Sequence, residues 1–76
     1  MKKQSYQILN YLKEHGDSPA IQIAEDLGME KRRVDSYFSA AIINAGMGER
    51  DQSVTPSILR LNEKGLAYVQ EEEEDE

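Results

Sequence analysis

Apolar residues at helical spacing predict two helices in the first 28 residues. One pattern covers residues 5–16, and the other covers residues 17–28 with apolar side chains at positions i, i+3, i+4 and i+7. Ser18 is a favourable N-cap for the second helix, and Pro19 suits its first position. A glycine ends each pattern, as at many helix C-termini. The apolar stripe of the first helix consists of Ile8, Leu9 and Leu12.

A third helix is predicted from about residue 30 to about residue 45, again from the spacing of its apolar residues. Its expected core positions are Val34, Phe38, Ala41, Ile42 and Ala45. Only Gly28 and Met29 separate this helix from the preceding one. So short a connection is typical of a helix-turn-helix.

The next segment predicts a β-hairpin. Residues 51–56 form a six-residue stretch rich in turn-forming residues, and a short segment that can extend lies on each side of it. Asn62 is a suitable N-cap for a short last helix. The predicted fold class is therefore α+β, mostly α: a three-helix bundle, a β-hairpin wing and a short C-terminal helix.

Two stretches carry a family resemblance over about residues 5–69. "SPAIQIAEDLGMEKRRVDSYF" resembles the helix-turn-helix of MarR-type and related bacterial or phage regulators. "LRLNEKGLAYV" is similar to their second wing strand and the helix that follows it. The resemblance implies a winged helix-turn-helix, and with it a cytoplasmic transcription regulator that binds double-stranded DNA.

The wing has a second resemblance. "VTPSILRL" is similar to the proline-bearing wing of Z-DNA-binding domains, and Pro56 matches the first proline of that wing. The other signature positions of those domains do not match, and an aspartate facing phosphates would repel them. The residues at these positions are Asp35, Ser39, Ser57 and Leu59.

The charge of the chain is unevenly distributed. Its net charge is -6, but residues 71–76 hold six of the fifteen acidic residues and no base, so residues 1–70 contain nine of each sign. We expect residues 1–70 to form one small domain and residues 71–76 to be a disordered acidic tail, because a run of like charge repels itself. Such a tail either competes with DNA for nearby cations or keeps the protein soluble.

Three consecutive cations at the start of the third helix form the candidate DNA site. Lys31, Arg32 and Arg33 oppose the helix dipole there, so an anionic partner explains them better than folding does. With this helix in the major groove and the wing on the backbone, two sets of contacts are expected. The residues expected near base edges are Arg32, Arg33, Ser36 and Tyr37. The residues expected on the DNA backbone are Lys31, Arg50, Thr55, Arg60 and, through N–H groups at a helix start, Ser18. The alternative is a solvated face paired with Glu30 and Asp35.

Other surfaces of the predicted fold favour protein partners. Ser39, Ala40 and Ile43 would form a smooth face of the third helix, suited to another protein unless the hairpin covers Ile43. With the neutral body and the acidic tail, this face supports the alternative of a winged helix that binds protein and not DNA. Three tyrosines would form a homodimer patch or else cover the edge of the core. They are Tyr6, Tyr11 and Tyr68.

Nothing in the sequence indicates an enzyme, a cofactor or a metal site. Cysteine is absent, which fits a reducing cytoplasm, and no phosphate-binding glycine loop, nucleophile motif or metal-ligand spacing occurs. The single histidine, His15, is expected to cap a helix C-terminus. No apolar run approaches the length of about 18 residues that a membrane span needs.

Overall fold

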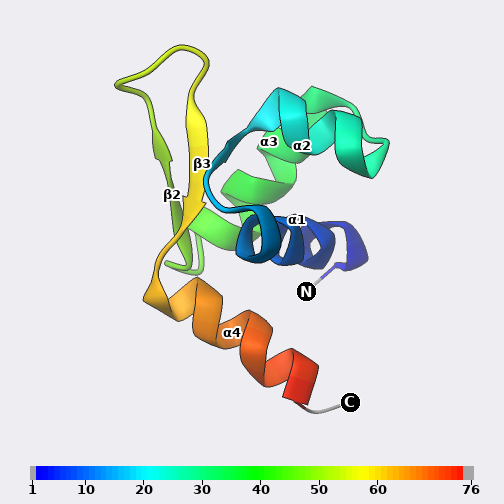
Figure 1. Cartoon of the computed structure of the whole chain (residues 1–76), viewed down its shortest axis with the longest axis vertical. Helices are drawn as coiled ribbons and strands as arrows, with labels where there is room; N and C mark the ends of the chain where they lie inside the picture. Colours follow the sequence, from blue (N-terminus) through cyan, green and yellow to red (C-terminus); the bar gives the residue numbers. More distant parts are fainter. Residues whose placement is uncertain (1, 75–76) are drawn as a thin grey trace.

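The computed structural model describes the backbone of residues 2–74 and the side chains of residues 2–69. Three helices in the first half of the chain pack around a common centre, with the hairpin on one side of them (Figure 1). These are the three helices that the apolar pattern predicts. Their bounds are Lys3–His15 for α1, Ala20–Leu27 for α2 and Lys31–Tyr37 for α3, which continues into a π-helical segment, η1, at Phe38–Ile43.

The connection before α2 differs from the prediction. Ser18 and Pro19 form a short strand, β1, and the helix starts only at Ala20. Ser18 is therefore not the N-cap: Pro19 holds that position in an extended conformation, with no side-chain cap. The Ser18 hydroxyl instead donates a hydrogen bond to the Gly16 carbonyl at 3.0 Å.

The π-helical segment changes the face that the end of the third helix presents to the core. The N–H of Asn44 donates to the Ser39 carbonyl and the N–H of Met47 to that of Ile42, each five residues back instead of four. Ala45, a predicted core residue, is therefore exposed, whereas Ile42 is fully buried. The wider turn breaks the regular spacing from which Ala45 was assigned to the core.

The hairpin consists of β2 (Gly48–Asp51) and β3 (Ile58–Leu61), joined by residues 52–57. The loop has the predicted length but lies one residue later, because Asp51 pairs with Ile58. β3 also pairs with β1, so the sheet has the order β1-β3-β2 and the hairpin is anchored to the start of α2. Gly48 allows β2 to lie close to η1, since a Cβ there would be 2.5 Å from the Arg60 carbonyl oxygen and 2.9 Å from Ile42 Cγ2.

The last helix, α4 (Glu63–Glu74), begins as predicted. The backbone N–H of Gly65 donates to Asn62 Oδ1 at 3.0 Å, so Asn62 is its N-cap. α4 extends past residue 70, the predicted end of the domain, and the backbone of residues 71–74 is helical. Glutamate is a good helix former, which favours this continuation of a helix already nucleated. The rest of the expected acidic tail, residues 75–76, lies outside the described residues.

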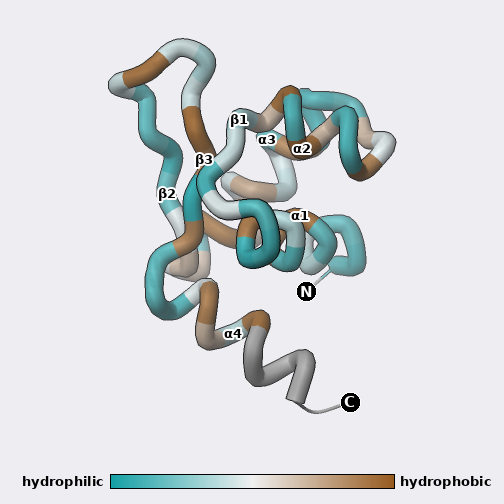
Figure 2. Tube along the Cα trace, in the orientation of Figure 1, coloured by the Kyte–Doolittle hydropathy of each residue, from teal (hydrophilic) through white to brown (hydrophobic). Residues whose placement is uncertain are grey.

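One hydrophobic core joins all these elements. Figure 2 shows hydrophobic positions along α1, α2 and β3. The fully buried apolar side chains are Ile8, Leu9, Ile23, Val34, Phe38, Ile42, Leu59 and Val69. A helix-turn-helix with an antiparallel hairpin and a last helix packed on α1 is a winged helix-turn-helix, as predicted. Between residues 2 and 74, none of the helices combines the length and apolar character needed to span a bilayer.

Candidate nucleic-acid interface

A groove of about 710 Å³ separates α3 from the wing. Polar side chains from both elements line it, together with apolar side chains from the wing loop and from the start of α2. The groove-lining residues are Ala20, Lys31, Asp35, Ser36, Ser39, Arg50, Gln52, Val54, Thr55, Pro56, Ser57 and Leu59. Four of the nine residues predicted to contact DNA therefore lie in one groove, because β1–β3 pairing holds the hairpin beside the helix-turn-helix. They are Lys31, Ser36, Arg50 and Thr55.

The three cations at the start of α3 differ in their surroundings. Lys31 Nζ lies 3.0 Å from Asp35 Oδ2, one turn further along the helix. Arg32 Nη2 lies 3.7 Å from Glu30 Oε2, but the Arg32 side chain is 85% exposed. The Arg33 side chain makes no hydrogen bond or ion pair with any described side chain, although its backbone N–H donates to the Glu30 carbonyl at 3.0 Å. Exposed pairs of this kind contribute only about 0–1 kcal/mol, so a polyanion can displace them.

Arg50 connects the wing to α3. Its Nη2 donates to Ser39 Oγ at 3.3 Å and lies 3.4 Å from Asp35 Oδ1. The guanidinium also lies over the Phe38 ring, 5.9 Å from its centroid, a distance at which a cation–π attraction operates. Arg50 therefore has a structural role in the free protein. Its expected contact with the DNA backbone stays a prediction.

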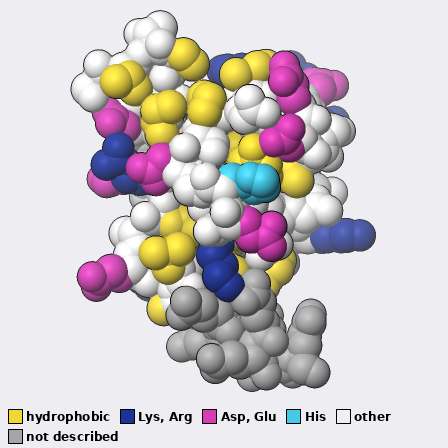
Figure 3. Space-filling view, viewed as in Figure 1, with side chains coloured by type: hydrophobic (Ala, Val, Ile, Leu, Met, Phe, Trp, Pro, Cys, Tyr) yellow, Lys and Arg dark blue, Asp and Glu magenta, His cyan; other side chains and the backbone are white. Residues whose placement is uncertain are grey.

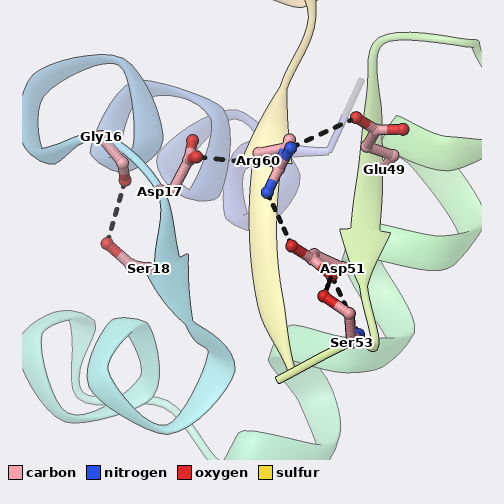
Figure 4. Close-up of polar contacts among 7 residues, drawn as sticks. All are labelled: Gly16, Asp17, Ser18, Glu49, Asp51, Ser53 and Arg60. Carbon is pink, nitrogen blue, oxygen red and sulfur yellow. Dashed lines mark hydrogen bonds and ion pairs between the residues drawn. The ribbon is translucent and has the colours of Figure 1, made fainter. Parts of the chain in front are cut away.

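Arg60 lies among three carboxylates on the other side of the hairpin (Figure 4). Its Nη2 donates to Asp51 Oδ2 at 2.9 Å, its Nη1 is 3.8 Å from Glu49 Oε1, and its Nε is 3.6 Å from Asp17 Oδ2. The predicted phosphate contact of Arg60 is therefore not supported, because acidic groups already surround the cation and it does not line the groove.

Asp51 is held in this cluster by more than Arg60. The hydroxyl and the backbone N–H of Ser53 both donate to Asp51 Oδ1, at 2.5 Å and 2.9 Å. These two bonds, followed by the charge of Arg60, hold the pKa of the Asp51 carboxyl below its ordinary value. The clustered charges make the outer side of the sheet a self-contained ionic network. Figure 3 agrees: over the hairpin, basic and acidic side chains lie next to one another.

The remaining predicted DNA contacts divide into two groups. Ser36 and Thr55 are exposed and line the groove, as the prediction requires. Tyr37 is half-buried against the core and does not line it, so a base contact by Tyr37 is not supported. Ser18 is only 7% exposed and is not at a helix start, which removes the reason for a phosphate contact there.

The predicted protein-binding face is only partly open. Ser39 is half-buried and bonded to Arg50. Ala40 is exposed and Ile43 is 37% exposed, so the hairpin does not cover Ile43. Two exposed positions, Ala40 and Ile43, remain, which is less than the continuous face that the helical pattern suggested.

The tyrosines serve mainly as core and edge residues. Tyr11 is 6% exposed, its hydroxyl donates to Asp26 Oδ2 at 2.5 Å, and its ring stacks on His15 with centroids 4.2 Å apart. A dimer contact through Tyr11 is therefore not supported, because its side chain is buried. Tyr6 and Tyr68 are half-buried, on helices that pack together.

The Tyr11–Asp26 bond is a feature that the sequence did not indicate. It raises the pKa of the Tyr11 hydroxyl and lowers that of the Asp26 carboxyl. The bond borders a second, polar depression of about 460 Å³. His15 lies in the last turn of α1, as expected, and its ring also stacks on Tyr11. Among the described residues, no group of three acidic or histidine side chains is arranged to hold a metal ion.

Comparison with known proteins supports the fold. No family model and no curated protein sequence matches the chain. Solved structures do: a MarR family protein from Bacillus stearothermophilus has a TM-score of 0.87 at 19% identity, over 99% of this chain and 53% of its own. A MarR family regulator from Neisseria meningitidis has a TM-score of 0.84 at 20% identity, over 99% of this chain and 54% of its own.

A third solved structure is similar over nearly the whole chain. The transcriptional regulator Tm0710 from Thermotoga maritima has a TM-score of 0.77 at 19% identity, over 97% of this chain and 55% of its own. This chain therefore spans about half the length of each of the three. At such low identity the likeness establishes the winged helix-turn-helix fold.

Proposed function

We propose that this protein is a winged-helix transcription regulator that binds double-stranded DNA, with α3 in the major groove and the wing on the backbone. The observation that carries the proposal is the cluster Lys31–Arg33 at the start of α3, beside the groove that the wing flanks. Cations there oppose the helix dipole, and the ion pairs of Lys31 and Arg32 are weak and exposed. DNA phosphates would form stronger ion pairs with these cations.

The structure narrows the contacts that we propose. Arg32 and Arg33 are the exposed cations best suited to base edges or phosphates, since arginine can donate two parallel hydrogen bonds. Lys31, Ser36 and Thr55 line the groove and would complete the contact. Being regulators, the structural neighbours from Neisseria meningitidis and Thermotoga maritima favour this role over catalysis. A homodimer would double a weak half-site contact and place two α3 helices one turn of DNA apart.

The experiment is a titration of labelled random duplex at several salt concentrations, read by fluorescence anisotropy. We expect binding at about 50 mM salt that falls steeply by about 200 mM, because phosphate contacts release counterions. The double variant Arg32→Ala, Arg33→Ala should reduce the slope of log K against log salt by about 2.

A matched control is the double variant Lys13→Ala, Lys64→Ala, which removes the same formal charge from α1 and α4. Its salt slope should stay within error of the wild-type slope. Equal loss in both double variants would mean that net charge alone drives binding, with no role for α3. Absence of duplex binding at about 50 mM salt would exclude the proposed function.

A second candidate function, a winged helix that binds protein, is favoured by the wing itself. Residues 52–57 carry no charge, Val54 is 45% exposed, and Arg60 is surrounded by carboxylates. A chain that binds no duplex, with or without residues 71–76, would belong to this class.

A further inference from the structure

The groove contains a carboxylate that is held from two sides. Asp35 Oδ2 lies 3.0 Å from Lys31 Nζ, and Asp35 Oδ1 lies 3.4 Å from Arg50 Nη2. Lys31 is on the same helix and Arg50 is on β2, so both walls of the groove orient this side chain. The Asp35 side chain is still 33% exposed.

We infer that Asp35 determines base specificity, by accepting a hydrogen bond from the exocyclic amine of a cytosine in the major groove. This inference rests on the proposed function, because it requires α3 to lie in that groove. Asp35 would then be a negatively charged residue that recognises a base, within an interface whose other proposed DNA contacts are mainly cations.

The donor and acceptor pattern of the bases gives the reason. An ionised carboxylate only accepts hydrogen bonds, and a cytosine offers its N4 amine as a donor on the major-groove edge. A guanine at the same position offers two acceptors, which repel a carboxylate. A phosphate repels it as well, so Asp35 is suited to a base edge and unsuited to the backbone.

The surroundings of Asp35 make this contact feasible. Two cations flank one carboxylate, so Lys31, Asp35 and Arg50 together have a formal charge of +1 and do not repel DNA as a group. A carboxylate has about four acceptor sites, and these two partners occupy only part of them. Ser36, next in sequence, is exposed in the same groove and leaves room for a base edge beside it.

The test starts from a randomised duplex pool selected with the full chain, followed by binding to duplexes with single base-pair changes. We expect one cytosine whose replacement by guanine weakens binding about tenfold. In Asp35→Ala this preference should fall to about twofold or less, while affinity for unrelated duplex rises because a negative charge is removed. Asp35→Asn should shift the preference toward adenine, the usual partner of an asparagine amide.

Two controls separate base reading from other effects. Glu30→Gln removes a carboxylate that pairs with Arg32 outside the groove, and it should leave the preference unchanged. The second control is a duplex in which that cytosine lacks its N4 amine, tested with the wild-type protein. Its affinity should fall by about the same factor as the cytosine preference falls in Asp35→Ala. This second control does not depend on how well any variant folds.

The outcomes distinguish this inference from the proposed function. A cytosine preference that survives in Asp35→Ala, or full affinity for the amine-free duplex, would overturn the role of Asp35. Salt-dependent binding by the wild type with no base preference would overturn it too, while supporting DNA binding. No duplex binding at low salt would overturn both.

Discussion

Arg60 and Arg33 carry the same guanidinium in opposite surroundings. Arg60, on the outer side of the sheet, lies within 4 Å of Asp17, Glu49 and Asp51. Arg33, in the first turn of α3, has no such partner among the described side chains. A count of cations along the sequence treats the two alike, but only the second can offer its charge to a partner without first losing intramolecular bonds. Arg60 therefore stabilises the wing, whereas Arg33 is the arginine that we propose to bind DNA.

Replacing Arg60 should lower the stability of the folded protein, and we expect this to be the largest effect. Arg60→Ala leaves three acidic side chains, two from β2 and one just before β1, close together without their cation. We expect the free energy of unfolding to fall by about 1–2 kcal/mol, measured by urea denaturation. The salt slope of duplex binding at a temperature where the variant is folded should not change. A reduced slope with unchanged stability would assign Arg60 to the interface after all.

Replacing Arg33 should give the opposite pattern. Arg33→Ala removes an exposed side chain, so its stability should stay within about 0.5 kcal/mol of the wild type. Duplex affinity at low salt should fall about fivefold, with the salt slope smaller by about 1, because one phosphate or base-edge contact is lost. Parallel anisotropy and denaturation series on both single variants would show whether the two arginines differ as proposed. Unchanged affinity in Arg33→Ala would remove it from the interface.

Acid should weaken the ionic cluster around Arg60. The folded-state pKa of Asp51 lies below the ordinary value of 3.8, so the folded state favours the ionised carboxylate. The stability that it contributes is complete above that ordinary value and is lost as the pH falls through the lowered pKa. Ser53→Ala removes the hydroxyl bond to Asp51 and should reduce stability at neutral pH, with the deficit disappearing in acid.

Denaturation midpoints of the wild type and Ser53→Ala across the acid range would measure this effect. Tyr11→Phe is a parallel case, because the Tyr11 hydroxyl lowers the pKa of Asp26. A deficit that stays constant with pH would mean that Ser53 acts through loop conformation and not through Asp51.

Removing residues 71–76 should have the smallest effect. α4 lies at one end of the molecule and α2 at the other, so the backbone of residues 71–74 lies far from α2 (Figure 1). Truncation should therefore raise low-salt duplex affinity by about threefold or less, through net charge alone. The difference should vanish at high salt in the same titration. A much larger gain would indicate that the tail covers the cations at the start of α3.

Much of the fold was predictable because its signals are local. The stripe Ile8, Leu9 and Leu12 and the two-residue connection at Gly28 and Met29 each depend on residues close in sequence. The same holds for Asn62, which caps the helix that starts at the next residue by accepting a bond from the N–H three residues later. The candidate site was less predictable. Arg32 and Arg33 are exposed as expected, but Tyr37 is packed against the core and Arg60 is paired, since their neighbours lie on other elements.

By itself the sequence determined the helices, the hairpin and the dense positive charge at the start of α3, since periodicity, caps and glycines act within a few residues. Only the tertiary structure decided that Ser18 is a strand residue paired with Leu59, that Tyr11 is buried on Asp26, and that Asp35 lies between Lys31 and Arg50. Most of these contacts join residues well separated along the chain. Their formation depends on how the hairpin and the helices pack, and no local pattern records that packing.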